Sequence, residues 1–117
     1  MPAETLAFIS YAYPDNKDGF VTDLYSRLVH ELQVQLGKRA NVFLDTSLRS
    51  GPWEPAHADA LERSKFLIPV VSPSYFKSDW CQRELDYFLE REQRVDRQLI
   101  FPVYYVDAED AAMLLST

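Results

Sequence analysis

The chain has 117 residues, 47% of them hydrophobic, and a formal net charge of −6 at pH 7. This length and composition suit one globular domain with a substantial core, while the acidic charge excludes the concentrated basic face that nucleic-acid binding needs. A single cysteine excludes an internal disulfide, and two histidines with no cysteine nearby offer no metal-ligand spacing, so we expect no metal site.

The first half of the chain predicts a strand, a helix and a second strand. The run LAFISYAY, residues 6–13, is apolar, ends at Pro14 and is typical of a buried strand. An amphipathic helix is expected over residues 18–37, because leucine or phenylalanine recurs every four residues and the segment closes at Gly37. NVFLD, residues 41–45, predicts the second strand.

The second half predicts two more helices and two more strands. A polar loop over residues 46–55 leads into a short helix at 54–64 that has proline near its first turn. KFLIPVVS, residues 65–72, is the third strand. A helix then runs from residue 79 to about 93, and LIFPVYYV, residues 99–106, is the fourth strand.

Strands that alternate with helices at this spacing need crossover connections, which are right-handed and build a parallel sheet with helices on both faces. The strands are apolar throughout, as expected when both faces are covered. We therefore predict a doubly wound, flavodoxin-like α/β fold with strand order 2-1-3-4. Four strands are visible, with a fifth absent or truncated. Residues 1–117 form a single domain, which is either complete or one piece of a longer protein.

Ligands bind such sheets outside the carboxyl ends of the strands. The loops after Tyr11, Asp45, Ser72 and Val106 therefore form the face of interest. None of them carries a familiar phosphate-binding signature, since both G-x-G-x-x-G and G-x-x-x-x-G-K-[ST] are missing from the sequence. No apolar run approaches the ~20 residues of a membrane span, and no signal pattern opens the chain, so we expect a cytoplasmic protein that does not bind membranes.

Short motifs in a fixed order carry a resemblance to a known family. They are FISYA, VFLD, GPWEP, and ALERSKFLIPVVSPSYFKSDWC followed by REL. From about Ala7 to Asp107 the sequence resembles the Toll/interleukin receptor (TIR) domain family. The resemblance implies a five-stranded parallel sheet, and therefore a fifth strand that is not visible here. It also implies either an interaction module that assembles signalling complexes or an enzyme that cleaves NAD after self-association, in signalling or immunity.

The resemblance also assigns a catalytic residue. NAD-cleaving members carry a glutamate four residues after the tryptophan of an S-x-W-C-x-x-E pattern, and this places the catalytic role on Glu84. NAD is then the substrate, and no cofactor is expected. Self-association is implied through the loop from Thr46 to Pro55 and the neighbouring helices.

Helical spacing singles out Glu84 independently of the family. Asp79 and Gln82 fit a capping box that starts the helix at about Trp80, so Trp80 and Glu84 lie one turn apart on the same face. The side chains within helical reach of Glu84 are unable to neutralise a carboxylate; they are Trp80, Cys81, Tyr87 and Phe88. Such surroundings solvate a carboxylate poorly, so we expect Glu84→Gln to leave the protein equally or more stable. The alternative is an ordinary surface acid near a helix N-terminus.

Residues near the first and third strands are candidate substrate contacts. Tyr11 and Tyr13, at the predicted end of the first strand, offer hydroxyl groups, although buried tyrosines near strand ends are common. Trp80 either holds the cationic nicotinamide ring or covers the core. We interpret Cys81 as a small core residue rather than a reactive thiol.

The loop after the second strand supplies three more candidates. Arg49 suits the oxygens of a pyrophosphate, or is solvated. Trp53 stacks on a base, or anchors the loop to the next helix. Asp45 binds a ribose hydroxyl, or caps the loop turn.

Two functions therefore stay open. The Trp80 and Glu84 pair favours a TIR-type NAD glycohydrolase. The acidic charge and the lack of a phosphate cradle favour a non-catalytic interaction module.

Overall fold

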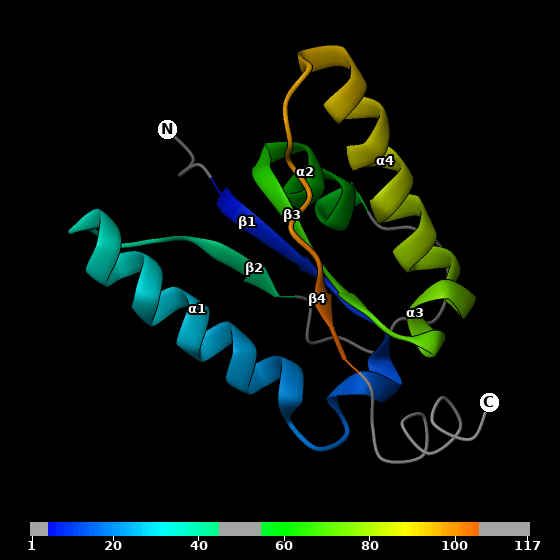
Figure 1. The fold of residues 1–117 in the computed structure, drawn as a ribbon, viewed down its shortest axis with the longest axis horizontal. Helices are drawn as coiled ribbons and strands as arrows, with labels where there is room; N and C mark the ends of the chain where they lie inside the picture. The colour runs from blue at the N-terminus through cyan, green and yellow to red at the C-terminus, as the bar shows by residue number, and fades with distance from the viewer. Residues whose placement is uncertain (1–4, 45–54, 106–117) are drawn as a thin grey trace.

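The computed structural model describes residues 5–44 and 55–105. Its centre is a parallel sheet with helices on both faces (Figure 1). The four strands among these residues are β1 (Thr5–Ser10), β2 (Val42–Leu44), β3 (Ser64–Val71) and β4 (Val103–Tyr104). They lie in the order β2-β1-β3-β4, and every neighbouring pair is parallel. The doubly wound α/β class and the strand order 2-1-3-4 are confirmed.

The helices are α1 (Phe20–Leu36), α2 (Pro55–Arg63), α3 (Pro73–Lys77) and α4 (Asp79–Val95), and a 3-10 turn, η1 (Tyr13–Asn16), follows β1. Glycines bound α1 at both ends, with φ of 81° at Gly19 and 67° at Gly37. A side chain with a Cβ is strained in this left-handed region, so the two glycines define where the helix starts and stops.

The first and fourth strands differ most from their predicted lengths. β1 ends at Ser10 rather than Tyr13, because Tyr13 is already the first residue of η1 and Pro14, whose fixed φ suits a helical first turn, is the second. In the predicted fourth strand, only Val103–Tyr104 forms a ladder, preceded by an isolated bridge between Leu67 and Ile100. Pro102 lies between these two pairings and has no N–H to donate, which accounts for the break.

The helix α3 was not predicted. Ser72 caps it by accepting a hydrogen bond from the backbone N–H of Tyr75 at 3.1 Å, and Pro73 follows at the first helical position. A serine cap followed by proline is a standard start signal that the strand prediction overlooked. The short helix buries Tyr75 completely beside the end of β1.

Apolar clusters flank the sheet on both sides. On one face Ile9 clusters with Val21 of α1, and on the other Phe8 clusters with Phe88 of α4. Alternate residues of β1 therefore point to opposite faces, as the pleat of a strand requires. Ser10, two residues after Phe8, points to the side covered by α2 and α4.

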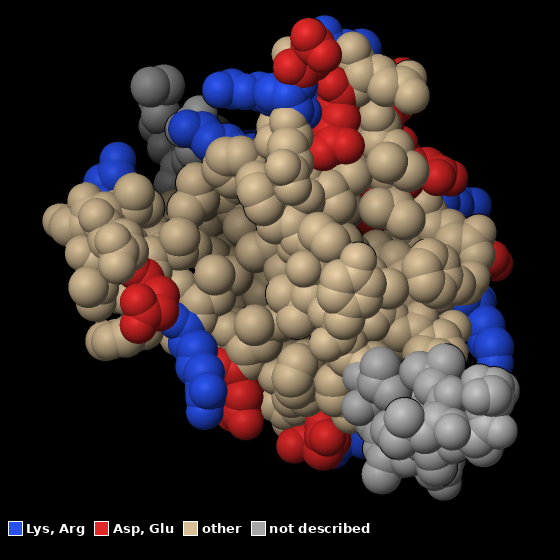
Figure 2. All heavy atoms as spheres, in the orientation of Figure 1, with Lys and Arg blue, Asp and Glu red and all other residues tan. Residues whose placement is uncertain are grey.

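Charged side chains are mixed on the face shown in Figure 2. Lys and Arg intersperse with Asp and Glu around the rim, and the middle of this face is largely uncharged. In the part of the chain that the structure describes, no helix combines the length and apolar character needed to cross a membrane.

Candidate active site

The S-x-W-C-x-x-E pattern occupies the first two turns of α4. The cap is Ser78, whose Oγ accepts a hydrogen bond from the backbone N–H of Cys81 at 3.3 Å. The predicted capping box of Asp79 and Gln82 is therefore wrong: Asp79 is the first helical residue, and the side chain of Gln82 donates to the carbonyl of Phe76 instead. Serine is as good a cap as aspartate, and here it stands one position earlier.

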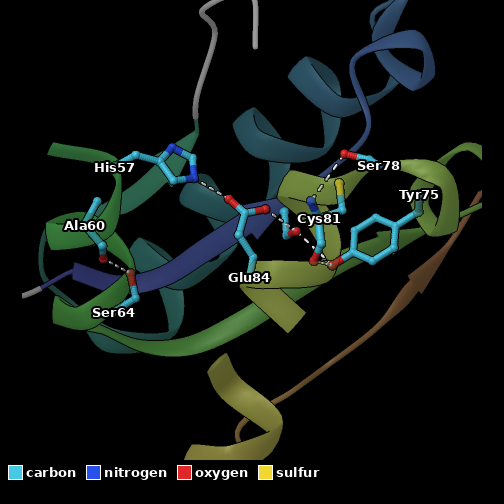
Figure 3. A network of polar contacts seen from close by, with 8 residues as sticks. His57, Ala60, Ser64, Tyr75, Ser78, Cys81 and Glu84 are labelled. Atoms are coloured by element: carbon cyan, nitrogen blue, oxygen red, sulfur yellow. Dashed lines mark hydrogen bonds and ion pairs between the residues drawn. The ribbon is translucent and has the colours of Figure 1, made fainter. Parts of the chain in front are cut away.

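Glu84 lies at the centre of a buried polar network (Figure 3). Its side chain is 0% exposed. Ser10, the last residue of β1, donates to Oε1 at 2.6 Å, and Nε2 of His57, on α2, contacts Oε2. Ser10 is the donor of the first contact, and His57 is the donor of the second when its Nε2 carries the ring hydrogen. Three elements that are distant in the sequence thus hold one carboxylate.

The network continues beyond Ser10. The hydroxyl of Tyr75, on α3, lies 2.8 Å from Ser10 Oγ and 3.4 Å from the carbonyl oxygen of Cys81. Ser10 has one hydroxyl proton and donates it to Glu84, so Tyr75 supplies the proton of the shorter contact. The result is a relay of hydrogen bonds from Tyr75 through Ser10 to Glu84.

The alternative that Glu84 is an ordinary surface acid is wrong, and the stability expectation for Glu84→Gln loses its basis. Glu84 is fully buried. It also has an imidazole partner, which helical spacing along α4 did not reveal because His57 belongs to α2. The expectation that Glu84→Gln leaves the protein equally or more stable assumed a carboxylate without such a partner.

Trp80 connects the network to an open groove. Its indole ring packs against the imidazole of His57 in a T-shaped arrangement, with 4.8 Å between ring centroids. Trp80 also lines a groove of about 360 Å³ together with Tyr13, which is 52% exposed. Two of the predicted substrate contacts, Tyr13 and Trp80, therefore share one groove.

Tyr11 lines a second cavity of about 360 Å³ with Tyr13, but it does not line the groove that contains Trp80. Tyr11 is 3% exposed and belongs to the core cluster that includes Val21 of α1. Cys81 is fully buried in a cluster with Tyr75, which confirms it as a packing residue. The remaining three predicted contacts lie outside the described residues; they are Asp45, Arg49 and Trp53.

The sequence analysis missed Ser10, His57 and Tyr75, and for the first two a signal was available. Ser10 interrupts an apolar strand on the side of Phe8, and a buried hydroxyl needs a hydrogen-bond partner. His57 stands three and four residues before Ala60 and Leu61, on the inner stripe of a short amphipathic helix. A polar residue at a core-facing position was the available signal in both cases.

No metal-binding group of three His, Cys, Asp or Glu side chains occurs among residues 5–44 and 55–105.

Comparison with known proteins identifies the family. Residues 7–116 match the family model described as TIR domain. The chain belongs to the TIR domain family. This TIR domain is 36% identical over 110 residues to the disease resistance-like protein DSC1 of Arabidopsis thaliana, which covers 92% of the chain. It is 33% identical over 105 residues to the NAD(+) hydrolase PdTIR of Paracoccus denitrificans, covering 88% of the chain.

Solved structures support the fold of the TIR domain. The TIR domains of the activated Roq1 resistosome align with a TM-score of 0.64 at 24% identity, covering 96% of this chain and 69% of that one. The TIR domain spans only 8% of the length of DSC1 and 32% of that of PdTIR. It therefore corresponds to one part of these longer relatives.

Proposed function

We propose that this TIR domain is an NAD glycohydrolase in which Glu84 is the catalytic residue. One observation carries the proposal. The glutamate of the S-x-W-C-x-x-E pattern is held by Ser10 at the carboxyl end of β1 and by His57, while Trp80 of the same pattern packs on His57. The relative named as an NAD(+) hydrolase supports this chemistry. The relatives named as disease resistance proteins support a role in immunity or signalling.

Cleavage of the bond between nicotinamide and ribose in NAD requires few catalytic groups. Nicotinamide leaves as a neutral molecule from a cationic ring, so its departure needs no general acid. The ribose becomes oxocarbenium-like as the bond stretches, as in glycoside cleavage. A single oriented carboxylate stabilises this positive charge or binds the ribose hydroxyls. Glu84 is proposed for this role.

Trp80 is proposed to hold the nicotinamide ring. The cationic ring is attracted to the face of an indole by about 0.5 to 2 kcal/mol. The groove shared by Trp80 and Tyr13 lies beside the start of α4 and offers a place for this part of the substrate. Tyr13 contributes a hydroxyl at its rim.

The segment after β2 is proposed to complete the site. Arg49 binds the pyrophosphate, Asp45 a ribose hydroxyl, and Trp53 either a base or the following helix. The same segment, from Thr46 to Pro55, is proposed to mediate self-association, on which activity depends. NAD is the substrate, no cofactor takes part, and the proposed location is the cytoplasm.

The second candidate is a non-catalytic TIR interaction module. The complete burial of Glu84 favours it, because a carboxylate satisfied by Ser10 and His57 also describes a structural core network. In that case the surface of the domain carries the function.

Nicotinamide release from NAD distinguishes the two. We expect concentrated protein to release nicotinamide, and Glu84→Gln to lose this activity while staying folded. Glu90→Gln is the matched control, since it makes the same charge change at an exposed position on α4. Turnover that survives in folded Glu84→Gln excludes the catalytic role, and inactive wild-type protein at all concentrations favours the module.

A further inference from the structure

We propose that His57 is a positioning residue that orients the carboxylate of Glu84 for the reaction. The proposal rests on the proposed NAD glycohydrolase function and deepens it. His57 touches neither the ribose nor the departing nicotinamide. It acts through its Nε2 contact to Oε2 of Glu84.

Aromatic rings hold the imidazole of His57 in place. Phe8 of β1, Phe43 of β2 and Trp80 of α4 all meet it in T-shaped contacts, with centroid distances of 5.2, 5.9 and 4.8 Å. His57 is 5% exposed, so the rings and the surrounding core leave little room for another rotamer. An imidazole held on several sides keeps its Nε2 pointed at one place, which suits a positioning group better than a mobile gate.

The carboxylate is held at both oxygens. Ser10 of β1 donates to Oε1, and Nε2 of His57 on α2 contacts Oε2, while the side chain itself comes from α4. The proposed role assigns the hydrogen of the second contact to Nε2. Two donors on different elements prevent rotation of the carboxylate about its last torsion, which is otherwise soft. Each carboxylate oxygen accepts more than one hydrogen bond, so Glu84 has acceptor capacity left for a ribose hydroxyl. Because its side chain is 0% exposed, that contact requires the side chains that cover it to move when NAD binds.

Trp80 adds a link between binding and orientation. The indole of Trp80, which is proposed to hold nicotinamide, packs on the imidazole of His57. The proposed binding surface is therefore in direct contact with the residue that orients Glu84. A change at His57 is therefore expected to affect the chemical step more than substrate affinity, because the indole itself is kept.

Substitutions at His57 test the proposal by nicotinamide-release kinetics on the full chain at high concentration. His57→Phe keeps a ring among Phe8, Phe43 and Trp80 but removes the donor to Glu84. We expect kcat to fall roughly tenfold to hundredfold, the loss expected when a reacting group is misplaced by about 1 Å. The KM for NAD should change by less than about threefold, since this variant keeps the nicotinamide surface.

His57→Gln is the rescue variant, because its amide N–H can replace Nε2–H as a donor. We expect log kcat of His57→Gln to lie at least halfway from the value of His57→Phe to that of the wild type. His30→Phe is the matched control at an exposed position on α1 and should leave both constants unchanged. Urea unfolding of each variant identifies any that is not folded under assay conditions. If His57→Phe is not folded, His57→Leu, which also lacks the donor, replaces it in the comparison with His57→Gln.

Each outcome has a defined meaning. If wild-type protein is active and Glu84→Gln is not, but folded His57→Phe keeps its kcat or gains activity, His57 does not position Glu84 and the proposed function stands. Equal losses in His57→Phe and His57→Gln, or losses confined to KM, also overturn the positioning role. If wild-type protein is inactive, or Glu84→Gln keeps its turnover, the proposed function fails and the positioning role fails with it.

Discussion

The imidazole of His57 contacts the carboxylate of Glu84 inside the protein, with side-chain exposures of 5% and 0%. The two residues lie 27 positions apart, on α2 and α4. Breaking a buried ionic or hydrogen-bonded pair by removing one partner is strongly destabilising, whereas the intact pair contributes little net stability. The pair therefore makes the fold sensitive to changes at Glu84, and it fixes the orientation of the proposed catalytic group.

The two obvious replacements of Glu84 should differ in stability. Glu84→Ala is expected to lower the free energy of unfolding by about 3 kcal/mol or more, because the buried donors of Ser10 and His57 lose this acceptor. Glu84→Gln should lower it less, since the amide oxygen still accepts from Ser10 and the amide N–H can donate to neutral His57. Urea unfolding measures both, with Glu90→Ala and Glu90→Gln as exposed controls. Equal losses for the two Glu84 variants would contradict the two-donor arrangement.

The relay from Tyr75 to Ser10 should be detectable as an energetic coupling. Ser10→Ala and Tyr75→Phe should each destabilise the protein by about 1 to 3 kcal/mol, because each leaves a buried polar group with one partner fewer. The double variant should lose less than the sum of the two, with a coupling of about 0.5 to 1.5 kcal/mol. Chemical denaturation of the wild type, the two single variants and the double variant gives this double-mutant cycle. Tyr104→Phe is the control, because Tyr104 is 74% exposed. Strict additivity would show that the two hydroxyls do not interact.

The cap of α4 should be Ser78 and not Asp79. Ser78→Ala removes the oxygen that accepts from the backbone N–H of Cys81, and it should cost about 1 kcal/mol of unfolding free energy. Asp79→Ala should cost less, about 0.3 to 1 kcal/mol, because Asp79 contributes only through the helix dipole. Thermal or urea unfolding compares the two variants. A larger effect at Asp79 would restore the capping box predicted from the sequence.

Replacement of Trp80 should chiefly weaken binding of NAD. Loss of an attraction of about 0.5 to 2 kcal/mol corresponds to a rise in KM of roughly two- to thirtyfold for Trp80→Ala. Trp80→Phe keeps an aromatic face and should show a smaller rise. Steady-state kinetics with NAD measures both, with Phe76→Ala as a control at an exposed aromatic residue of α3. An unchanged KM in Trp80→Ala would remove Trp80 from the proposed site.

Specific activity should rise with protein concentration. Activity is proposed to depend on self-association, so dilution shifts the population towards the less active monomer by mass action. Nicotinamide release per molecule is measured across a hundredfold dilution series, together with the mass of the particles at each concentration. A constant specific activity throughout the series would show that one copy suffices.

Local sequence patterns determined the architecture of this protein and the position of its central residue. Leucine and phenylalanine at helical spacing placed α1, and Gly37 ended it where predicted. Apolar strands separated by helices were enough to predict a parallel sheet and its order, because crossover handedness permits few alternatives. The S-x-W-C-x-x-E pattern placed Glu84 on α4, and the family comparison supports that pattern as part of a TIR domain.

The partners of Glu84 were decided by tertiary structure alone. Ser10 lies 74 positions away and His57 27 positions away, so neither spacing appears in a helical or strand period. Periodicity shows which side of an element faces the core, but it does not show which residue of another element stands opposite. The end of β1 at Ser10 and the packing of α2 beside α4 bring the two donors to the carboxylate. Burial then makes these contacts obligatory, because a carboxylate removed from water must find its hydrogen bonds within the fold.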